Sequence, residues 1–165
     1  QQISEVMFNL LDSHDTERIL TTAKGKLQSV KSALAFLYLQ RGTPCIYYGT
    51  ELALIGGPDP DCRRVMPWER VSADNDMLNF MKDLIQLRKE VAGVIQHGKV
   101  SLEEVEPDVV AVEWQHEGHI LKAYFNHSKK DFVLERGQAD LISLGSVSGE
   151  QLTIQPNGFV IYRED

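Results

Sequence analysis

The sequence has few cysteines, no long hydrophobic run and a shortage of basic residues. Its two cysteines, Cys45 and Cys62, have no metal-like spacing and are interpreted as reduced thiols of a cytoplasmic protein, a disulfide being the alternative. No apolar run approaches the roughly 18 residues of a membrane-spanning helix. The 17 Lys and Arg against 24 Asp and Glu give a net charge of −7. This balance argues against nucleic acid or an anionic membrane as a partner, because both are bound by basic patches.

What is present is typical of a soluble globular protein. Apolar residues make up 42% and charged residues 25% of the 165 positions, which excludes a disordered chain. This length suits one ordinary domain, or a small domain joined to part of another. The chain starts with Gln1 instead of Met and soon enters an apolar segment. We therefore expect it to be part of a longer protein.

The first half alternates apolar strands with helical periodicity. The segment Val6–Leu11 is nearly continuously apolar, as is typical of a parallel strand buried on both faces. A helical stripe from Lys24 to Arg41 ends at a Gly-Thr-Pro sequence. A short strand, Cys45–Tyr48, precedes a long loop and a second predicted helix, Asp76–Glu90. The predicted buried residues are Leu27, Val30, Leu34, Leu37 and Tyr38 in the first helix, and Met77, Met81, Leu84, Leu87 and Val91 in or just after the second. This order predicts an α/β fold.

Beyond about Gly93 the pattern changes to short β-rich runs separated by turn residues. These runs predict an antiparallel β-sandwich, and the boundary is placed so that the domains are 1–95 and 96–165. The predicted strands are Val100–Val105, Val109–Trp114, Ile120–Phe125, Phe132–Leu134, Leu152–Ile154 and Phe159–Tyr162. Residues 106–108, 116–118, 126–128 and 156–158 are the predicted turns.

A polar cluster, Asp12-Ser13-His14-Asp15-Thr16, directly follows the first predicted strand. Barrel enzymes carry their catalytic groups at the carboxyl ends of parallel strands. A His beside an Asp can act as a general base with its orienting partner, or as a pair of substrate contacts. Ser and Asp also cap helices, because their oxygens accept the free N–H groups of the first turn. From the residues alone, capping is the stronger interpretation.

A second polar segment, Gly56–Arg64, mixes acidic and basic residues. Such loops suit sugars, whose hydroxyls both donate and accept hydrogen bonds. Composition alone favours an ordinary solvated loop. Tyr47, Tyr48 and Trp68 flank this segment. They could stack on sugar rings, although buried aromatic residues more often fill a core.

Other candidate motifs are weaker evidence for a functional site. Asn126-His127 lies at a strand end in the β-rich half and is best explained as a hairpin turn. The sequence contains no Gly-rich phosphate loop, no metal-spaced His and Cys cluster and no Ser/His/Asp arrangement. We therefore expect neither a cofactor nor a bound metal.

Three segments together resemble the α-amylase family of glycoside hydrolases. Asn9–Arg18 resembles the family's fourth conserved segment, at the end of the seventh barrel strand, and Gly42–Glu51 resembles its eighth strand. Gly56–Trp68 is similar to the loop typical of neopullulanases, cyclomaltodextrinases and maltogenic amylases. The order and spacing match, and the β-rich half fits the family's C-terminal sandwich. The resemblance implies an α/β plus all-β chain: the last two βα units of a (β/α)₈ barrel, then an antiparallel β-sandwich.

The resemblance also implies a reaction. Such an enzyme cleaves α-1,4 bonds of cyclodextrins, pullulan and maltooligosaccharides with retention, and α-1,6 bonds are a further candidate. Retention needs a nucleophile and an acid/base carboxyl group about 5 Å apart. In this family both come from the fourth and fifth barrel strands, upstream of Gln1. We therefore expect this chain alone to be inactive.

The resemblance assigns roles to four residues. Asp15 matches the family's third carboxylate, which holds sugar hydroxyls and stabilises the transition state, and His14 would hydrogen-bond the same sugar. Asp59 and Arg63 match the pair that binds the next sugar towards the non-reducing end. The family usually has Pro where this chain has Glu17, and an acidic residue is electrostatically acceptable in a first helical turn.

A non-catalytic function remains the alternative. The same scaffold could serve as a carbohydrate-binding or packing module. In either case the exposed edges of two isolated barrel strands would favour aggregation or a homodimer.

Overall fold

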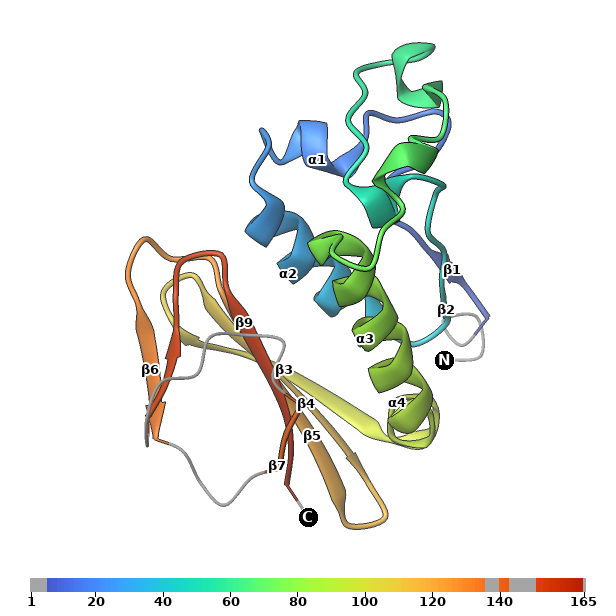
Figure 1. Cartoon of the computed structure of the whole chain (residues 1–165). Coiled ribbons are helices and arrows are strands. Elements are labelled where there is room, and N and C mark those ends of the chain that lie inside the picture. Colours follow the sequence, from blue (N-terminus) through green and yellow to red (C-terminus); the bar gives the residue numbers. More distant parts are fainter. Residues whose placement is uncertain (1–5, 136–139, 143–150, 165) are drawn as a thin grey trace. The chain divides into compact units, whose positions relative to one another are not determined.

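The computed structural model describes residues 6–135, 140–142 and 151–164 of the chain. It divides into two compact units, Gln1–Arg88 and Lys89–Asp165 (Figure 1). The domain boundary placed after residue 95 on sequence grounds stays a prediction. Within the described part of the chain, no helix is long and apolar enough to cross a membrane.

The N-terminal unit alternates short strands and helices. Its elements are β1 (Phe8–Asn9), α1 (Ile19–Thr22), α2 (Leu27–Tyr38), β2 (Thr43–Pro44), the 3₁₀ helices η1 (Thr50–Leu52), η2 (Asp61–Arg63) and η3 (Trp68–Arg70), and α3 (Asp76–Glu90), whose last residues enter the second unit. The expected strand–helix–strand–helix order is therefore present, with one additional α-helix, α1.

The first predicted helix is wrong at both ends. A helix from Lys24 is excluded because Lys24 and Gly25 have φ values of 54° and 76°, in the left-handed region. The two residues separate α1 from α2, which begins at Leu27 and ends at Tyr38. Of the predicted stripe, Leu27 is only partly buried, whereas Val30, Leu34, Leu37 and Tyr38 are buried.

The second predicted helix is confirmed as α3, and all its predicted buried residues are buried. α3 lies beside α2 and runs in the same direction (Figure 1). Near the helix starts, Lys31 Nζ lies 2.7 Å from Asp76 Oδ2. At the other end, the Arg88 guanidinium donates to the carbonyl oxygens of Tyr38 at 2.6 Å, Gln40 at 2.7 Å and Gly42 at 2.9 Å. Arg88 therefore supplies donors to the end of α2 and to the turn that leads into β2.

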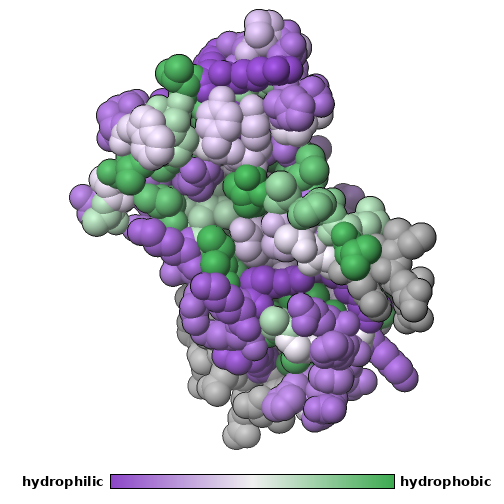
Figure 2. Space-filling view, turned by 90° about the vertical axis from the view of Figure 1, so that its right-hand side faces the viewer, coloured by the Kyte–Doolittle hydropathy of each residue, from purple (hydrophilic) through white to green (hydrophobic). Residues whose placement is uncertain are grey.

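β1 and β2 pair in parallel, with Phe8 opposite Thr43. The expectation of a strand Val6–Leu11 buried on both faces is wrong here, since Phe8 is 71% exposed and Val6, Met7 and Leu10 are also exposed. Hydrophobic side chains are accordingly visible at the surface (Figure 2). The reason is that β1 pairs only with β2 among the described residues. A single neighbour leaves its faces uncovered.

The second predicted strand is displaced. The paired residues are Thr43 and Pro44 instead of Cys45–Tyr48. One further ladder bond joins the Cys45 N–H to the Asn9 carbonyl at 2.7 Å. After that the chain turns, and the Thr50 N–H donates to the Tyr47 carbonyl at 3.2 Å to begin η1. The apolar run continues past the strand because Tyr47 and Tyr48 pack on a buried side chain, described below.

The C-terminal unit is rich in antiparallel sheet. Its elements are α4 (Ala92–His97), β3 (Lys99–Glu106), β4 (Val109–His116), β5 (His119–Asn126), β6 (Phe132–Glu135), β7 (Asp140–Ile142), β8 (Gln151–Ile154) and β9 (Phe159–Glu164). One sheet has the order β3-β4-β5-β9-β7, and β6 pairs with β8 in a second. Each predicted strand is present and slightly longer than expected. Neither α4 nor β7 was predicted.

Residues of both sheets share one buried cluster. Val109, Val160 and Tyr162 come from the larger sheet, and Phe132, Leu152 and Ile154 come from β6 and β8. Alternation along each strand places these side chains on one face. A common hydrophobic core therefore joins the two sheets within this unit.

Asn126 ends β5, where the chain leaves the larger sheet. The predicted hairpin turn is wrong, because β5 pairs with β4 and β9 whereas the next strand, β6, pairs with β8. The Asn126 side chain is fully buried, and Nδ2 donates to the carbonyl oxygens of Lys130 at 2.8 Å and Ile154 at 2.7 Å. Its Oδ1 accepts the N–H of Ser128 at 2.9 Å. These bonds satisfy the amide inside the fold.

We predict that Arg88→Ala lowers the free energy of unfolding by about 2 kcal/mol, because three carbonyls lose a charged donor. Urea unfolding followed by circular dichroism measures the change. Lys89→Ala, an exposed change at the next position of the same helix, should cost less than about 0.5 kcal/mol. Equal stability of the two variants would contradict a capping role for Arg88.

Candidate active site

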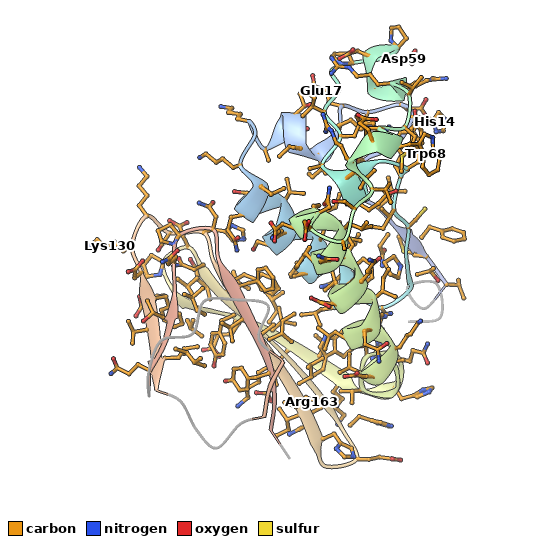
Figure 3. All side chains as sticks on the ribbon, in the orientation of Figure 1. His14, Glu17, Asp59, Trp68, Lys130 and Arg163 are labelled. Atoms are coloured by element: carbon orange, nitrogen blue, oxygen red, sulfur yellow. The ribbon has the colours of Figure 1, made fainter. Side chains whose placement is uncertain are left out.

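The loops that follow β1 and β2 meet at one end of the N-terminal unit, where His14 and Asp59 are labelled (Figure 3). His14 Nε2 lies 3.2 Å from Asp15 Oδ2. Arg63 Nη2 lies 3.8 Å from Asp15 Oδ1, and Arg63 Nε lies 2.6 Å from Asp59 Oδ1. The four residues singled out from the sequence therefore form one continuous polar cluster, with Arg63 between the two carboxylates.

All four side chains of the polar cluster are open to solvent. The exposed fractions are 61% for His14, 70% for Asp15, 52% for Asp59 and 49% for Arg63. The charge of Asp59, and less strongly that of Asp15, raises the pKa of Arg63 above its usual value. Exposed ion pairs contribute little to folding. Stability alone therefore gives no reason for this concentration of charge.

The capping role belongs to Asp12 instead of Asp15. Asp12 is buried, and its Oδ2 accepts the N–H of Ile19, the first residue of α1, at 3.1 Å. The hydroxyl of Thr50 lies 3.1 and 3.0 Å from the two oxygens of the same carboxylate. The Asp15 carboxylate contacts His14 and Arg63. The capping interpretation of the sequence cluster therefore applies to Asp12, and the substrate-contact interpretation of Asp15 stays a prediction.

Arg18 is a fully buried residue for which the sequence analysis proposed no role. Its Nε donates to the Cys62 carbonyl at 2.7 Å, and Nη1 donates to the Tyr48 carbonyl. The guanidinium carbon lies 4.0 Å from the ring centre of Tyr47 and 4.6 Å from that of Tyr48. Planar guanidinium groups stack well on aromatic rings. A lone Arg after a polar cluster carries no sequence signal of burial, because its partners lie 30 and 44 residues away.

The segment Gly56–Arg64 folds back on itself. The Asp61 carboxylate accepts the Gly57 N–H at 2.7 Å and two bonds from Arg64, at 2.8 and 2.9 Å. The bonds from Arg64 are the main cause of a lowered pKa for Asp61. A side chain at Gly56 would approach the Asp61 carbonyl to 2.6 Å. The charged side chains are exposed, as in a solvated loop, but hydrogen bonds to Asp61 and close packing at Gly56 restrain the backbone.

The aromatic residues have different roles. Tyr47 and Tyr48 form an edge-to-face pair with ring centres 4.6 Å apart, and both lie on the Arg18 guanidinium. Burial, followed by the hydrogen bond to Tyr48, raises the pKa of Tyr47. Trp68 is 72% exposed. The core-filling interpretation is therefore wrong for Trp68, whose indole face is available to a ligand.

The polar cluster can hydrogen-bond a polyhydroxyl ligand. The carboxylates of Asp15 and Asp59 accept bonds, whereas His14 and Arg63 donate. Among the described residues, no group of three or more His, Cys, Asp or Glu side chains could hold a metal ion. The arrangement suits recognition of sugar hydroxyls.

Comparison with known proteins identifies the family. Residues 1–85 match the model of the alpha amylase catalytic domain. This chain belongs to the alpha-amylase family. An intracellular maltogenic amylase of Bacillus subtilis (strain 168) is 44% identical over 128 residues, covering 76% of this chain and 22% of that protein. Neopullulanase 2 of Thermoactinomyces vulgaris is 38% identical over 140 residues, covering 81% of this chain and 23% of that protein.

Solved structures agree with this membership of the alpha-amylase family. A structure titled cyclomaltodextrinase has a TM-score of 0.78 and 30% identity, covering 98% of this chain and 30% of that one. The resemblance stated from three sequence segments is confirmed. The chain spans less than a quarter of the length of the two sequence relatives described above.

We predict that Arg18→Lys lowers the free energy of unfolding by about 3 kcal/mol. A compact ammonium cannot bond both carbonyls and stack on both rings, so buried acceptors lose their partners. Urea unfolding of the chain measures the loss. Glu17→Ala, an exposed change at the preceding position, should stay within about 0.5 kcal/mol of the parent. A stable Arg18→Lys variant would show that this guanidinium does not hold the loops together.

Proposed function

We propose that this chain is the C-terminal part of a retaining α-glucan hydrolase of the neopullulanase or cyclomaltodextrinase kind. The observation that carries the proposal is the polar cluster His14, Asp15, Asp59 and Arg63, which is assembled from the loops after two parallel strands. Catalytic groups lie at this end of the strands in barrel enzymes. The names of the relatives point to the same class of substrate.

In this proposal β1 and β2 are the seventh and eighth strands of a (β/α)₈ barrel. Their parallel pairing, with α2 between them and α3 afterwards, supports it. The exposed apolar side chains of β1 also support it, because barrel strands are normally covered on both faces. Residues 96–165 would form the β-sandwich, supported by the core that the two sheets share.

Asp15 acts on the transition state in the proposed mechanism. Its carboxylate binds hydroxyls of the reacting sugar and stabilises the positive charge that develops on the ring in the transition state. His14, 3.2 Å away, donates to the same sugar and orients it. The nucleophile and the general acid come from strands outside this chain. The chain alone is therefore inactive, since neither step of retention can proceed without them.

Asp59 and Arg63 bind the next sugar towards the non-reducing end. Their ion pair of 2.6 Å presents an acceptor and a donor side by side at the loop surface. Binding energy from a remote sugar is partly used to orient and distort the reacting one. The pair therefore determines how well long substrates are used.

Substrate range follows from the class of enzyme. We propose cyclodextrins, pullulan and maltooligosaccharides as substrates, with cleavage of α-1,4 bonds and, as the second linkage, α-1,6 bonds. We also propose a cytoplasmic enzyme, as for the relative named an intracellular maltogenic amylase. A homodimer is the assembly that we propose.

The central prediction concerns Asp15→Asn in the full-length enzyme. The change keeps the size of the side chain and removes its charge, so kcat/KM should fall by at least roughly 10²-fold while the melting temperature stays nearly constant. Hydrolysis of β-cyclodextrin and of p-nitrophenyl maltosides, followed by reducing sugar and p-nitrophenol release, measures the effect. This chain alone serves as the inactive blank.

Asp83→Asn is the matched control, since Asp83 is exposed on α3. It should retain full activity. Near-normal turnover of Asp15→Asn would remove the catalytic assignment and favour a non-catalytic carbohydrate-binding or packing module.

A separate prediction concerns substrate length. Replacing Asp59 or Arg63 by Ala should reduce kcat/KM for long maltooligosaccharides at least roughly tenfold more than for maltosides too short to reach the pair. Arg64→Ala is the control, because it breaks the neighbouring pair with Asp61 without touching Asp59. Equal losses on short and long substrates in all three variants would mean that the loop has only a structural role.

A further inference from the structure

The His14 carbonyl oxygen accepts two hydrogen bonds from consecutive residues of η2. Cys62 Sγ and Arg63 Nε each lie 3.2 Å from it. A peptide carbonyl has two lone pairs, so these donors saturate it. The peptide that joins His14 to Asp15 is therefore held from the loop that also carries Asp59.

The two donors differ in how firmly they can hold the carbonyl. Arg63 Nε carries one hydrogen and also lies 2.6 Å from Asp59 Oδ1, so that hydrogen is shared with a closer, charged acceptor. The Cys62 side chain is fully buried, and water does not compete for its S–H. The thiol hydrogen is thus directed at His14, while the Cys62 sulfur also interacts with the Arg63 side chain.

Cys62 is itself fixed from the other side. Its carbonyl accepts the bond of 2.7 Å from the buried Arg18 Nε. A methyl group at Gly56 would lie 2.9 Å from the Cys62 Cα, which shows how closely the backbone packs there. A continuous path of contacts therefore runs from the Arg18 guanidinium through Cys62 to the peptide before Asp15.

We propose that Cys62 is a positioning residue whose thiol sets the orientation of the His14–Asp15 peptide. This inference rests on the proposed function of Asp15 and His14. When a sugar engages Asp59 and Arg63, their ion pair must adjust, whereas the thiol bond does not involve the ligand. The thiol keeps the imidazole and the carboxylate in register with the reacting sugar. Misplacement of a catalytic group by about 1 Å can cost 10²-fold in rate.

The first test observes the hydrogen bond without any reaction. His14-Asp15 is the only His-Asp dipeptide in the chain, so labelling His with ¹³C at the carbonyl and Asp with ¹⁵N gives a single NMR cross-peak. In the chain, Cys62→Ala should move the His14 carbonyl resonance upfield, and Cys62→Ser, which keeps a donor, should largely restore it. Cys45→Ala, the same change at an exposed cysteine, should leave it in place. An unmoved resonance in Cys62→Ala overturns the proposal.

The second test uses the full-length enzyme well below its melting temperature. Cys62→Ala should lower kcat about tenfold on short and long maltooligosaccharides alike with little change in KM, because the effect passes through Asp15. Cys62→Ser should recover most of the activity, and Cys45→Ala should match the parent enzyme. Equal activity of the Ala and Ser variants, or a loss confined to long substrates, overturns the proposal.

The two ideas fail in different ways. If Asp15→Asn keeps its turnover, the proposed function fails, whatever happens to the carbonyl resonance. If Asp15→Asn is inactive but Cys62→Ala changes neither the resonance nor kcat, only the positioning role of Cys62 is wrong.

Discussion

The buried guanidinium of Arg18 is the contact on which the N-terminal unit depends. It joins the segment after β1 to the Tyr47–Tyr48 pair after β2 and to the Cys62 carbonyl in η2. Burying a charge is unfavourable unless its donors are satisfied. Here two carbonyls and two aromatic rings replace water, and Nη2 remains without a partner among the described residues. A buried cation can persist at this position only because all three segments close around it.

In this arrangement the buried and the exposed residues have different roles. Asp12 and Arg18 are buried and hold the loops, whereas Asp15 and Arg63 are exposed and contribute little to stability. A side chain that contributes little to folding stability can contact a ligand instead. Exposed loops that follow paired strands are therefore available to a ligand. The core shared by the two sheets of the C-terminal unit is a separate cluster, formed by residues of β4, β6, β8 and β9.

The local patterns of the sequence were sufficient for several elements. The bounds of α3 and the centres of β4, β5 and β9 were predictable, because apolar periodicity and turn residues act within a few positions. The segments around Asp15 and Arg63 were recognisable for the same reason, as contiguous motifs. One prediction failed because a distant partner decides the outcome: β1 is exposed because it has one neighbouring strand among the described residues. The start of the first helix failed for a local reason, because Lys24 and Gly25 adopt left-handed φ values that apolar periodicity does not reveal.

The sequence by itself determined the family and most of the order of strands and helices, with α1, α4 and β7 missed. It also singled out the four residues that the structure brings into the polar cluster. Only the tertiary structure decided that Asp12 caps α1 and Asp15 does not, that Arg18 is buried, and that Cys62 donates to the His14 carbonyl. The physical reason is the sequence separation over which each kind of interaction acts. Periodicity and capping preferences involve neighbours within one or two turns, whereas burial of Arg18 and the Cys62 bond join residues 44 and 48 positions apart.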